Sequence, residues 1–209
     1  MKLIVFGSTG GIGRNIVQQA LDEGHEVTAI ARTPSKLGIE HSNLTIVKGD
    51  AFQPATFDNA MKGQDVVLSA LGVNSTKPTT VYSQGVANIV QVMEKHGVHR
   101  IMCISASAVE TSPLASFLLR IGIKILQRIL KNMYSDLLKM EKILKQSNLT
   151  YTIVRPPRLT NKPLTGKYRF AVNEWLPSCL SISRADVAHF MLHHLCDSNT
   201  YKFLVEVAY

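Results

Sequence analysis

The sequence contains few cysteines. Its 209 residues include only Cys103, Cys179 and Cys196. An odd number of cysteines without a C-x-x-C pair does not suit a disulfide scaffold or a zinc site. His189 and His193 lie four residues apart on a predicted helix, a spacing that could bind a metal, but no carboxylates support it and an ordinary helix face is the preferred interpretation. We therefore expect three free thiols, a reducing cytoplasmic compartment and no metal.

The sequence also lacks long hydrophobic runs and is short of acidic residues. The apolar run before Gly7 is only four residues long, too short for a signal peptide or a membrane span. Lysine and arginine number 23 against 15 acidic residues, a net charge of +8. Such a balance fits nucleic acid, an anionic membrane or a polyanionic cofactor. No nucleic-acid motif accompanies the charge, so we do not expect a nucleic-acid partner.

The sequence does contain alternating strand and helix patterns along its whole length. Strands separated by helix-length segments predict βαβ units, hence a mostly parallel sheet with helices on both faces. The prediction is an α/β fold, a single Rossmann-type doubly wound domain over 1–209. We expect strands at 3–6, 26–31, 44–48, 65–70, 100–105, 149–154 and 203–207, and helices at 11–23, 80–96, 136–146 and 185–195.

A glycine-rich motif lies between the first strand and the first helix. Its G-x-x-G-x-x-G spacing is typical of dinucleotide-binding loops, in which a helix N-terminus faces the pyrophosphate. Gly7 permits the sharp turn, Gly10 lets the backbone approach the phosphates, and Gly13 lets the helix pack closely on the sheet. The predicted phosphate loop is Gly7, Ser8, Thr9, Gly10, Gly11, Ile12 and Gly13.

The residues after the second strand favour NADPH over NADH. NAD-selective proteins tend to place an acidic residue there, for the ribose 2′-hydroxyl. This sequence has Arg32, Thr33 and Lys36 instead. A guanidinium can pair with a 2′-phosphate, so Arg32 is the main predicted contact.

Two further segments are predicted beside the adenosine half of the cofactor. Asp50 follows the third strand, where it could accept a hydrogen bond from the adenine amino group. The fourth strand ends at Ala70, Leu71 and Gly72. Both predictions rest on the position of these residues in the expected fold.

These motifs resemble those of atypical short-chain dehydrogenases/reductases, the group that includes NmrA-like NAD(P)-binding proteins. The second half of the sequence is similar in particular to the biliverdin-IXβ reductase, or NADPH-dependent flavin reductase, family. The similar segments keep the order of that family and are 79–90, 151–157, 163–168 and 182–192.

The resemblance implies a Rossmann monomer, although a homodimer stays open. Its chemistry would be hydride transfer from NADPH to a planar acceptor, such as FMN or FAD as substrate, a biliverdin-like tetrapyrrole or a quinone. It implies that Ser105, Ser107, Pro156 and Pro157 lie on the nicotinamide side, and Arg155 and Arg158 near the substrate. Ala106 stands where the family usually has a hydroxyl residue, which leaves the substrate open. Tyr168 and Trp175 could stack on an aromatic acceptor.

The sequence lacks a Tyr-x-x-x-Lys pair, the acid–base pair of carbonyl-reducing relatives. Tyr134 and Lys139 are five residues apart, which places them roughly 140° apart around a helix. Flavin reduction needs no such pair, because it depends chiefly on the positioning of two rings. A non-catalytic NADP(H)-binding regulator of the NmrA kind is the alternative.

The segment 113–131 combines apolar residues at helical spacing with Arg120, Lys124, Arg128 and Lys131 on another face. Its place after the fifth strand puts it at the ligand-binding edge of the sheet. Three interpretations remain open at this point. The segment is a lid over the site, a surface for a partner or a second copy, or a helix that lies on a membrane surface.

Overall fold

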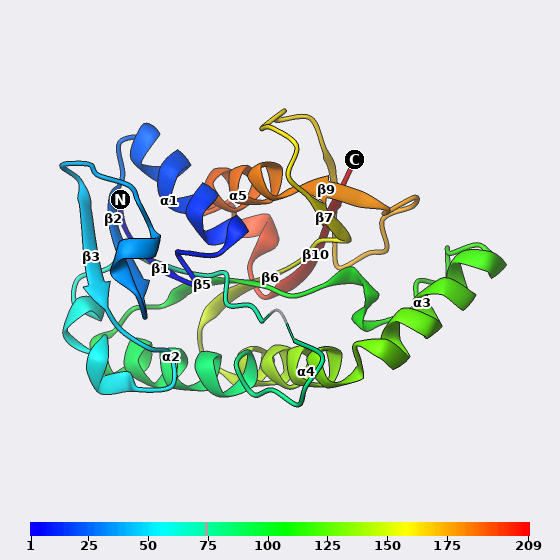
Figure 1. Cartoon of the computed structure of the whole chain (residues 1–209), viewed down its shortest axis with the longest axis horizontal. Coiled ribbons are helices and arrows are strands. Elements are labelled where there is room, and N and C mark those ends of the chain that lie inside the picture. Colours follow the sequence, from blue (N-terminus) through cyan, green and yellow to red (C-terminus); the bar gives the residue numbers. More distant parts are fainter. Residues whose placement is uncertain (74) are drawn as a thin grey trace.

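A computed structural model describes residues 1–73 and 75–209 and contains a mostly parallel, eight-stranded sheet. The strand order is β3-β2-β1-β4-β5-β6-β10-β8, and β8 alone pairs antiparallel, with β10 (Figure 1). This order confirms the predicted doubly wound Rossmann class. The strands are β1 (Lys2–Phe6), β2 (Glu26–Ala31), β3 (Leu44–Lys48), β4 (Val66–Ser69), β5 (Arg100–Ile104), β6 (Thr150–Arg155), β8 (Arg169–Val172) and β10 (Phe203–Ala208).

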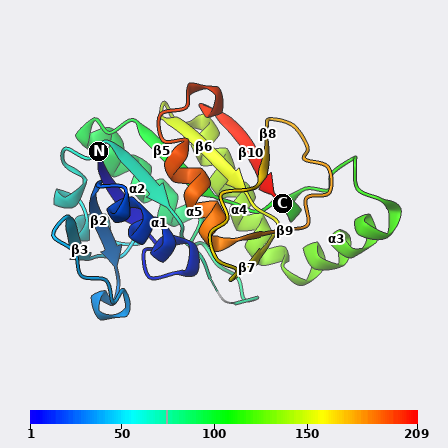
Figure 2. The same cartoon turned by 90° about the horizontal axis from the view of Figure 1, so that it is seen from above.

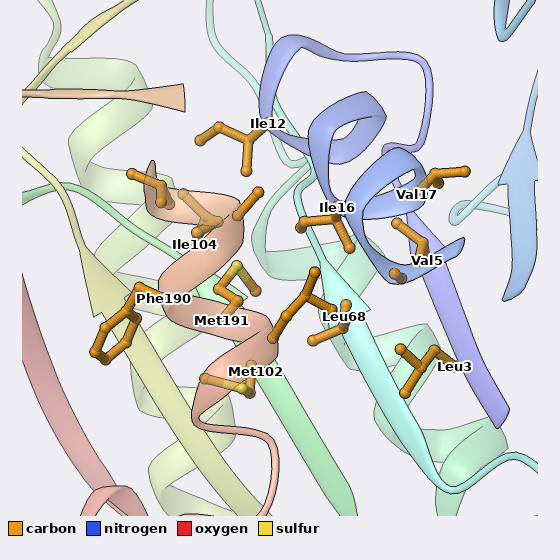
Figure 3. Packing of buried hydrophobic residues seen from close by; sticks show 14 of the residues in the cluster. Leu3, Val5, Ile12, Ile16, Val17, Leu68, Met102, Ile104, Phe190 and Met191 are labelled. Atoms are coloured by element: carbon orange, nitrogen blue, oxygen red, sulfur yellow. The ribbon is translucent and has the colours of Figure 1, made fainter. Parts of the chain in front are cut away.

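Helices cover both faces of the sheet. One face carries α1 (Gly11–Asp22) and α5 (Arg184–His193), and the other carries α2 (Ser83–His96) and α4 (Lys131–Gln146) (Figure 1). Between α1, α5 and the sheet, Ile16, Leu68 and Met191 are fully buried (Figure 3). Apolar residues at helical and strand spacing therefore form a core on each side of the sheet.

The prediction that helices alternate with strands throughout is wrong for two connections. The β2–β3 connection contains the 3-10 turn η1 (Pro34–Lys36), and the β3–β4 connection contains η2 (Pro54–Thr56) and η3 (Asn59–Met61). Proline stands in the first turn of η1 and of η2, where it is tolerated but prevents the turn from extending toward the N-terminus. Leu37, Phe57 and Met61 are buried there, so irregular segments cover the sheet in place of α-helices.

The helix α3 (Phe117–Ile129) differs from the other helices in its burial. It projects from the end of the sheet and joins α4 through a bend at Leu130 (Figure 2). Every residue of α3 is at least partly exposed. Within the described residues, no helix has the length and hydrophobicity needed to span a bilayer.

The segment between β6 and α5 forms a small second sheet that the sequence patterns did not predict. It pairs β7 (Arg158–Thr160) with β9 (Ser181–Ser183) in parallel. The carboxylate of Asp186 on α5 accepts hydrogen bonds from the backbone N–H groups of Thr165 and Gly166 and from the Tyr209 hydroxyl. These bonds fix the 161–168 loop beside the main sheet.

Candidate functional site

A large cavity opens at the carboxyl ends of the parallel strands. Its volume is about 1110 Å³, and it runs from the loop after β1 to the inner sides of α3 and α4. Ligands of doubly wound proteins bind at this edge of the sheet. The volume lies just above the roughly 300–1,000 Å³ of most small-molecule pockets, so the cavity is large for a ligand site.

The glycine loop is built so tightly that side chains do not fit at two of its positions. Gly7 has a φ of +72°, and a Cβ atom there would lie 2.3 Å from the Ala70 carbonyl oxygen. A Cβ atom at Gly13 would lie 2.1 Å from the Gly7 carbonyl oxygen. Both distances are far below van der Waals contact, so the predicted roles of Gly7 and Gly13 agree with the geometry.

The N-terminus of α1 fits an anionic group. Gly10 is its N-cap and supplies no side-chain cap, and the first turn carries no acidic residue. The leading N–H groups of a helix have no partners within the helix and carry partial positive charge. A pyrophosphate at this point would satisfy them, which is the fit expected for a dinucleotide.

Most of the predicted site residues come together around the cavity. The predicted residues that line it are Gly7, Thr9, Gly10, Gly11, Ile12, Arg32, Asp50, Ala70, Leu71, Gly72, Ser105, Ser107, Pro156, Pro157, Arg158 and Trp175. The described lining does not include Ser8, Gly13, Thr33, Lys36, Arg155 or Tyr168.

Three of the residues outside the lining have other places in the fold. Ser8 is buried, and its hydroxyl donates to the Ile30 carbonyl oxygen at 2.8 Å, which ties the glycine loop to β2. Thr33 is the N-cap of η1, and Lys36 lies at the end of that turn. Of the two predicted basic residues of this segment, the structure therefore places Arg32 against the cavity. Its side chain is exposed and follows the end of β2.

Arg155 has a structural position instead of the predicted contact with a substrate. Its Nη2 lies 2.6 Å from Glu141 Oε2, its Nε 2.8 Å from Glu141 Oε1, and its Nη1 2.6 Å from Glu110 Oε2. Burial opposes the charge of Arg155, but the hydrogen bonds and charge of Glu141 outweigh it and raise the pKa of the guanidinium. The cation is thus fully engaged within the protein.

The same network holds the predicted nicotinamide-side serine. Ser105 lines the cavity, and its Oγ donates to Glu141 Oε1 at 2.7 Å. Its neighbour Ser107 donates its backbone N–H to the Pro156 carbonyl oxygen at 3.0 Å. The ends of β5 and β6 are therefore joined, and the Ser105 hydroxyl is held in one orientation rather than free to act on a substrate.

Tyr168 is directed away from the cavity, contrary to the prediction. Its hydroxyl lies 2.8 Å from His189 Nδ1, and its ring packs edge-on against Phe190. Burial raises the pKa of Tyr168 to about 12. The rings of His189 and His193 stack on one another, and the described residues contain no group of three potential metal ligands.

Several lining residues were missed by the sequence analysis. The Arg184 side chain lies across Gly11, where a Cβ atom would come within 2.5 Å of Arg184 Cδ. Arg184 is thus a cation beside the N-terminus of α1, in addition to Arg32 elsewhere on the cavity wall. Glu206 on β10 also lines the cavity, and burial raises the pKa of its carboxyl group. Arg184 was findable, because it immediately precedes the predicted helix at 185–195.

Tyr82 and Tyr134 bring two phenol groups to the same cavity. Burial raises the pKa of both, so both stay protonated at neutral pH. The buried Asp136 carboxylate accepts from the backbone N–H groups of Tyr82 and Ser83 and so fixes α4 against the start of α2. Lys139 is exposed and lies outside the described lining, which agrees with the predicted absence of a Tyr–Lys pair.

The far end of the cavity is apolar. Its wall on α3 comes from Leu119, Ile123 and Leu126, and its wall on α4 from Met133 and Leu137. The predicted 113–131 segment therefore forms a side wall of the site through one face of α3. The opposite face of the helix is exposed, so α3 does not close over the cavity as a buried lid.

Comparisons with known proteins agree with this geometry. The chain is 30% identical over 159 residues to the photosystem II assembly factor Ycf39 of Synechocystis, covering 74% of this chain but only 44% of that protein. It is 28% identical over 207 residues to a protein of Bacillus subtilis named as an uncharacterized sugar epimerase, covering 96% and 90% of the two chains.

Solved structures share the fold. A proposed NADH-flavin reductase from Streptococcus pneumoniae superposes with a TM-score of 0.80 at 23% identity, covering 100% of this chain and 99% of that one. A short-chain dehydrogenase/reductase from Veillonella parvula, solved with NADP, superposes with a TM-score of 0.81 at 18% identity and coverages of 100% and 94%. At these identities the likeness is one of fold. The model of the NAD(P)H-binding family matches residues 7–198, and the chain belongs to that family.

Proposed function

We propose that the protein is an NADPH-dependent reductase that passes a hydride to a planar acceptor of the flavin, tetrapyrrole or quinone class. The observation that carries the proposal is the continuity of one cavity, with a phosphate-binding end at the glycine loop and Arg32 and an apolar end at α3 and α4. Two flat molecules can lie in contact in such a cavity. Holding two rings at reacting distance supplies much of the catalysis that hydride transfer needs.

The residues at the cofactor end would each bind a different part of NADPH. When bound, NADPH supplies a hydride from its nicotinamide ring. The N-terminus of α1 and Arg184 would hold the pyrophosphate, and Arg32 the 2′-phosphate. Ser105, Pro156 and Pro157 would form the surface against which the nicotinamide lies. Solvent can supply the accompanying proton, and the protonated phenol of Tyr134 is a second donor on the cavity wall.

The direct test is NADPH oxidation measured with FMN, FAD, biliverdin and a short-chain quinone in turn. Turnover with at least one of them supports the reductase. Tight NADPH binding without turnover of any would favour the NmrA-like regulator. Failure of NADPH and NADP⁺ to bind at all would remove both functions.

The preference for NADPH is tested by Arg32→Glu. We expect the NADPH KM to rise about tenfold or more, a loss of about 1.4 kcal/mol, while the KM for NADH changes little. The matched control is Lys36→Glu, which makes the same charge change outside the described lining. An effect of the control as large as that of Arg32→Glu would show that the general field of this segment, and not Arg32 itself, selects the phosphate.

A further inference from the structure

The helix α3 presents one broad apolar surface, and only one side of it is used by the cavity. At about 100° per residue, Leu119, Ile123 and Leu126 lie on one side of the helix, toward the cavity. Leu118, Ile125 and Ile129 continue the same apolar arc to the outside, where their exposures are 78%, 56% and 60%. We call this outer set, together with Phe117 and Ile121, the outer arc.

The outer arc is unusual for a surface that faces water. Phe117 is 77% exposed, and Leu114 in the preceding loop is exposed as well. Single exposed apolar residues are normal, whereas contiguous ones mark a contact with a partner or a membrane. The helix α3 projects from the end of the sheet (Figure 2), and the side chains of its outer arc are exposed.

The charges near the outer arc indicate which kind of partner covers it. Arg120, Lys124 and Arg128 form a stripe along the edge of the outer arc. Residues 111–135 contain no aspartate or glutamate. A second copy of the chain would bring an identical positive stripe against the first. An anionic membrane surface instead offers negative headgroups to the stripe and acyl chains to the outer arc, the pattern of interfacial helices.

We propose that α3 is an interfacial helix that docks the protein on anionic membranes. The outer arc enters the boundary of the acyl chains, and the basic stripe lies among the headgroups. Because the inner side of the same helix lines the cavity, the apolar end of the cavity lies next to the bilayer. The docking goes beyond the proposed reductase activity and does not depend on turnover.

The test is flotation with vesicles of phosphatidylcholine alone or mixed with phosphatidylglycerol. The wild-type protein should float with the mixed vesicles at low salt, less at high salt, and hardly at all with phosphatidylcholine alone. A wild-type protein that stays unbound from mixed vesicles at low salt would overturn the proposal without any variant. Binding that ignores both salt and lipid charge would overturn the role of the basic stripe.

Two paired variants locate the contact. Lys124→Gln with Arg128→Gln should weaken binding to the mixed vesicles roughly 30-fold, since both charges lie near the headgroups. The matched control, Lys48→Gln with Lys162→Gln, removes the same net charge from exposed positions on β3 and the 161–168 loop. Equal losses from both pairs would mean that net charge alone attracts the protein, which overturns the assignment to α3.

The apolar contact is tested by Leu118→Ser with Ile125→Ser, which should lower binding at least about tenfold. An NADPH titration of each variant, expected to match the wild type, checks that the fold is intact.

Sedimentation of the wild type without vesicles tests whether a second copy of the chain covers the outer arc instead. A dimer that the Leu118 and Ile125 substitutions dissociate would assign the outer arc to a second copy and refute membrane docking.

Discussion

The two ends of the cavity are built from different parts of the chain. The cofactor end is made by the backbone, where Gly7 and Gly13 bring main-chain atoms together at distances that exclude a side chain. The apolar end, where we propose that the acceptor binds and which we call the acceptor end, is made by side chains, among them Ile123 on α3 and Tyr134 on α4. A site formed by main-chain atoms binds one kind of chemical group, here a phosphate. A site formed by side chains can change its shape with each substitution.

This difference teaches where specificity resides. Any dinucleotide presents the same pyrophosphate, so the cofactor end needs only close packing and free N–H groups. The acceptor must be recognised by shape and polarity, which depend on individual side chains. Between the two ends, the buried cluster of Glu141, Arg155 and Ser105 joins α4 to the ends of β5 and β6.

The largest expected effect comes from breaking that cluster. In Glu141→Gln, the Arg155 cation stays buried with only the half-exposed Glu110 as an anionic partner. Loss of one member of a buried pair typically costs about 3–5 kcal/mol, so urea should unfold this variant at a much lower concentration. Glu110→Gln is the control and should cost under about 1 kcal/mol. Similar midpoints for the two variants would refute the central place of Glu141.

An intermediate effect should follow from adding one methyl group to the backbone end. Gly7→Ala forces an L-residue into the left-handed region and brings its Cβ against the Ala70 carbonyl group, for an expected loss of roughly 2–4 kcal/mol. Gly63→Ala has nearly the same φ, +69°, but an added Cβ would meet open space. It should cost about 1 kcal/mol from backbone strain alone.

Thermal unfolding and NADPH titration measure both glycine variants. Gly7→Ala should also lose NADPH affinity, whereas Gly63→Ala should keep it. If the two variants lost equal stability, the positive φ, and not close packing, would explain why position 7 requires glycine.

The cofactor end of the cavity was more predictable from the sequence than the acceptor end. The tight geometry of the glycine loop was predictable, because glycine spacing after a strand encodes main-chain geometry directly. Of the residues predicted at this end, Ser8, Gly13, Thr33 and Lys36 lie outside the described lining of the cavity. Arg32 was predicted from its distance beyond the second strand, and the structure places it against the cavity. The mostly parallel sheet was predicted from the alternating strand and helix patterns, whereas the order of its strands was not predicted.

The acceptor end was less predictable, because its contacts join residues distant in sequence. The family resemblance assigned Arg155 to a substrate, and nothing local in the sequence shows that Glu141 and Glu110 bind it instead. Tyr168 was also assigned to the substrate, although its partner His189 lies on another element. The apolar pattern of 113–131 predicted a helix, but a helical pattern cannot say which side of its apolar surface meets the cavity.

The smallest expected effect tests the two sides of that helix directly. Ile123→Ala shortens a half-buried side chain on the cavity side of α3, which removes apolar contact from the acceptor. We expect the acceptor KM to rise about threefold to tenfold, with the NADPH KM unchanged. Ile121→Ala, on the outer arc of the same helix, makes the same change away from the cavity and should leave both constants alone. The measurement is steady-state NADPH oxidation with whichever acceptor is turned over. If Ile123→Ala raised the NADPH KM equally, the two ends of the cavity would not be separate, and the division between backbone and side-chain recognition would fail.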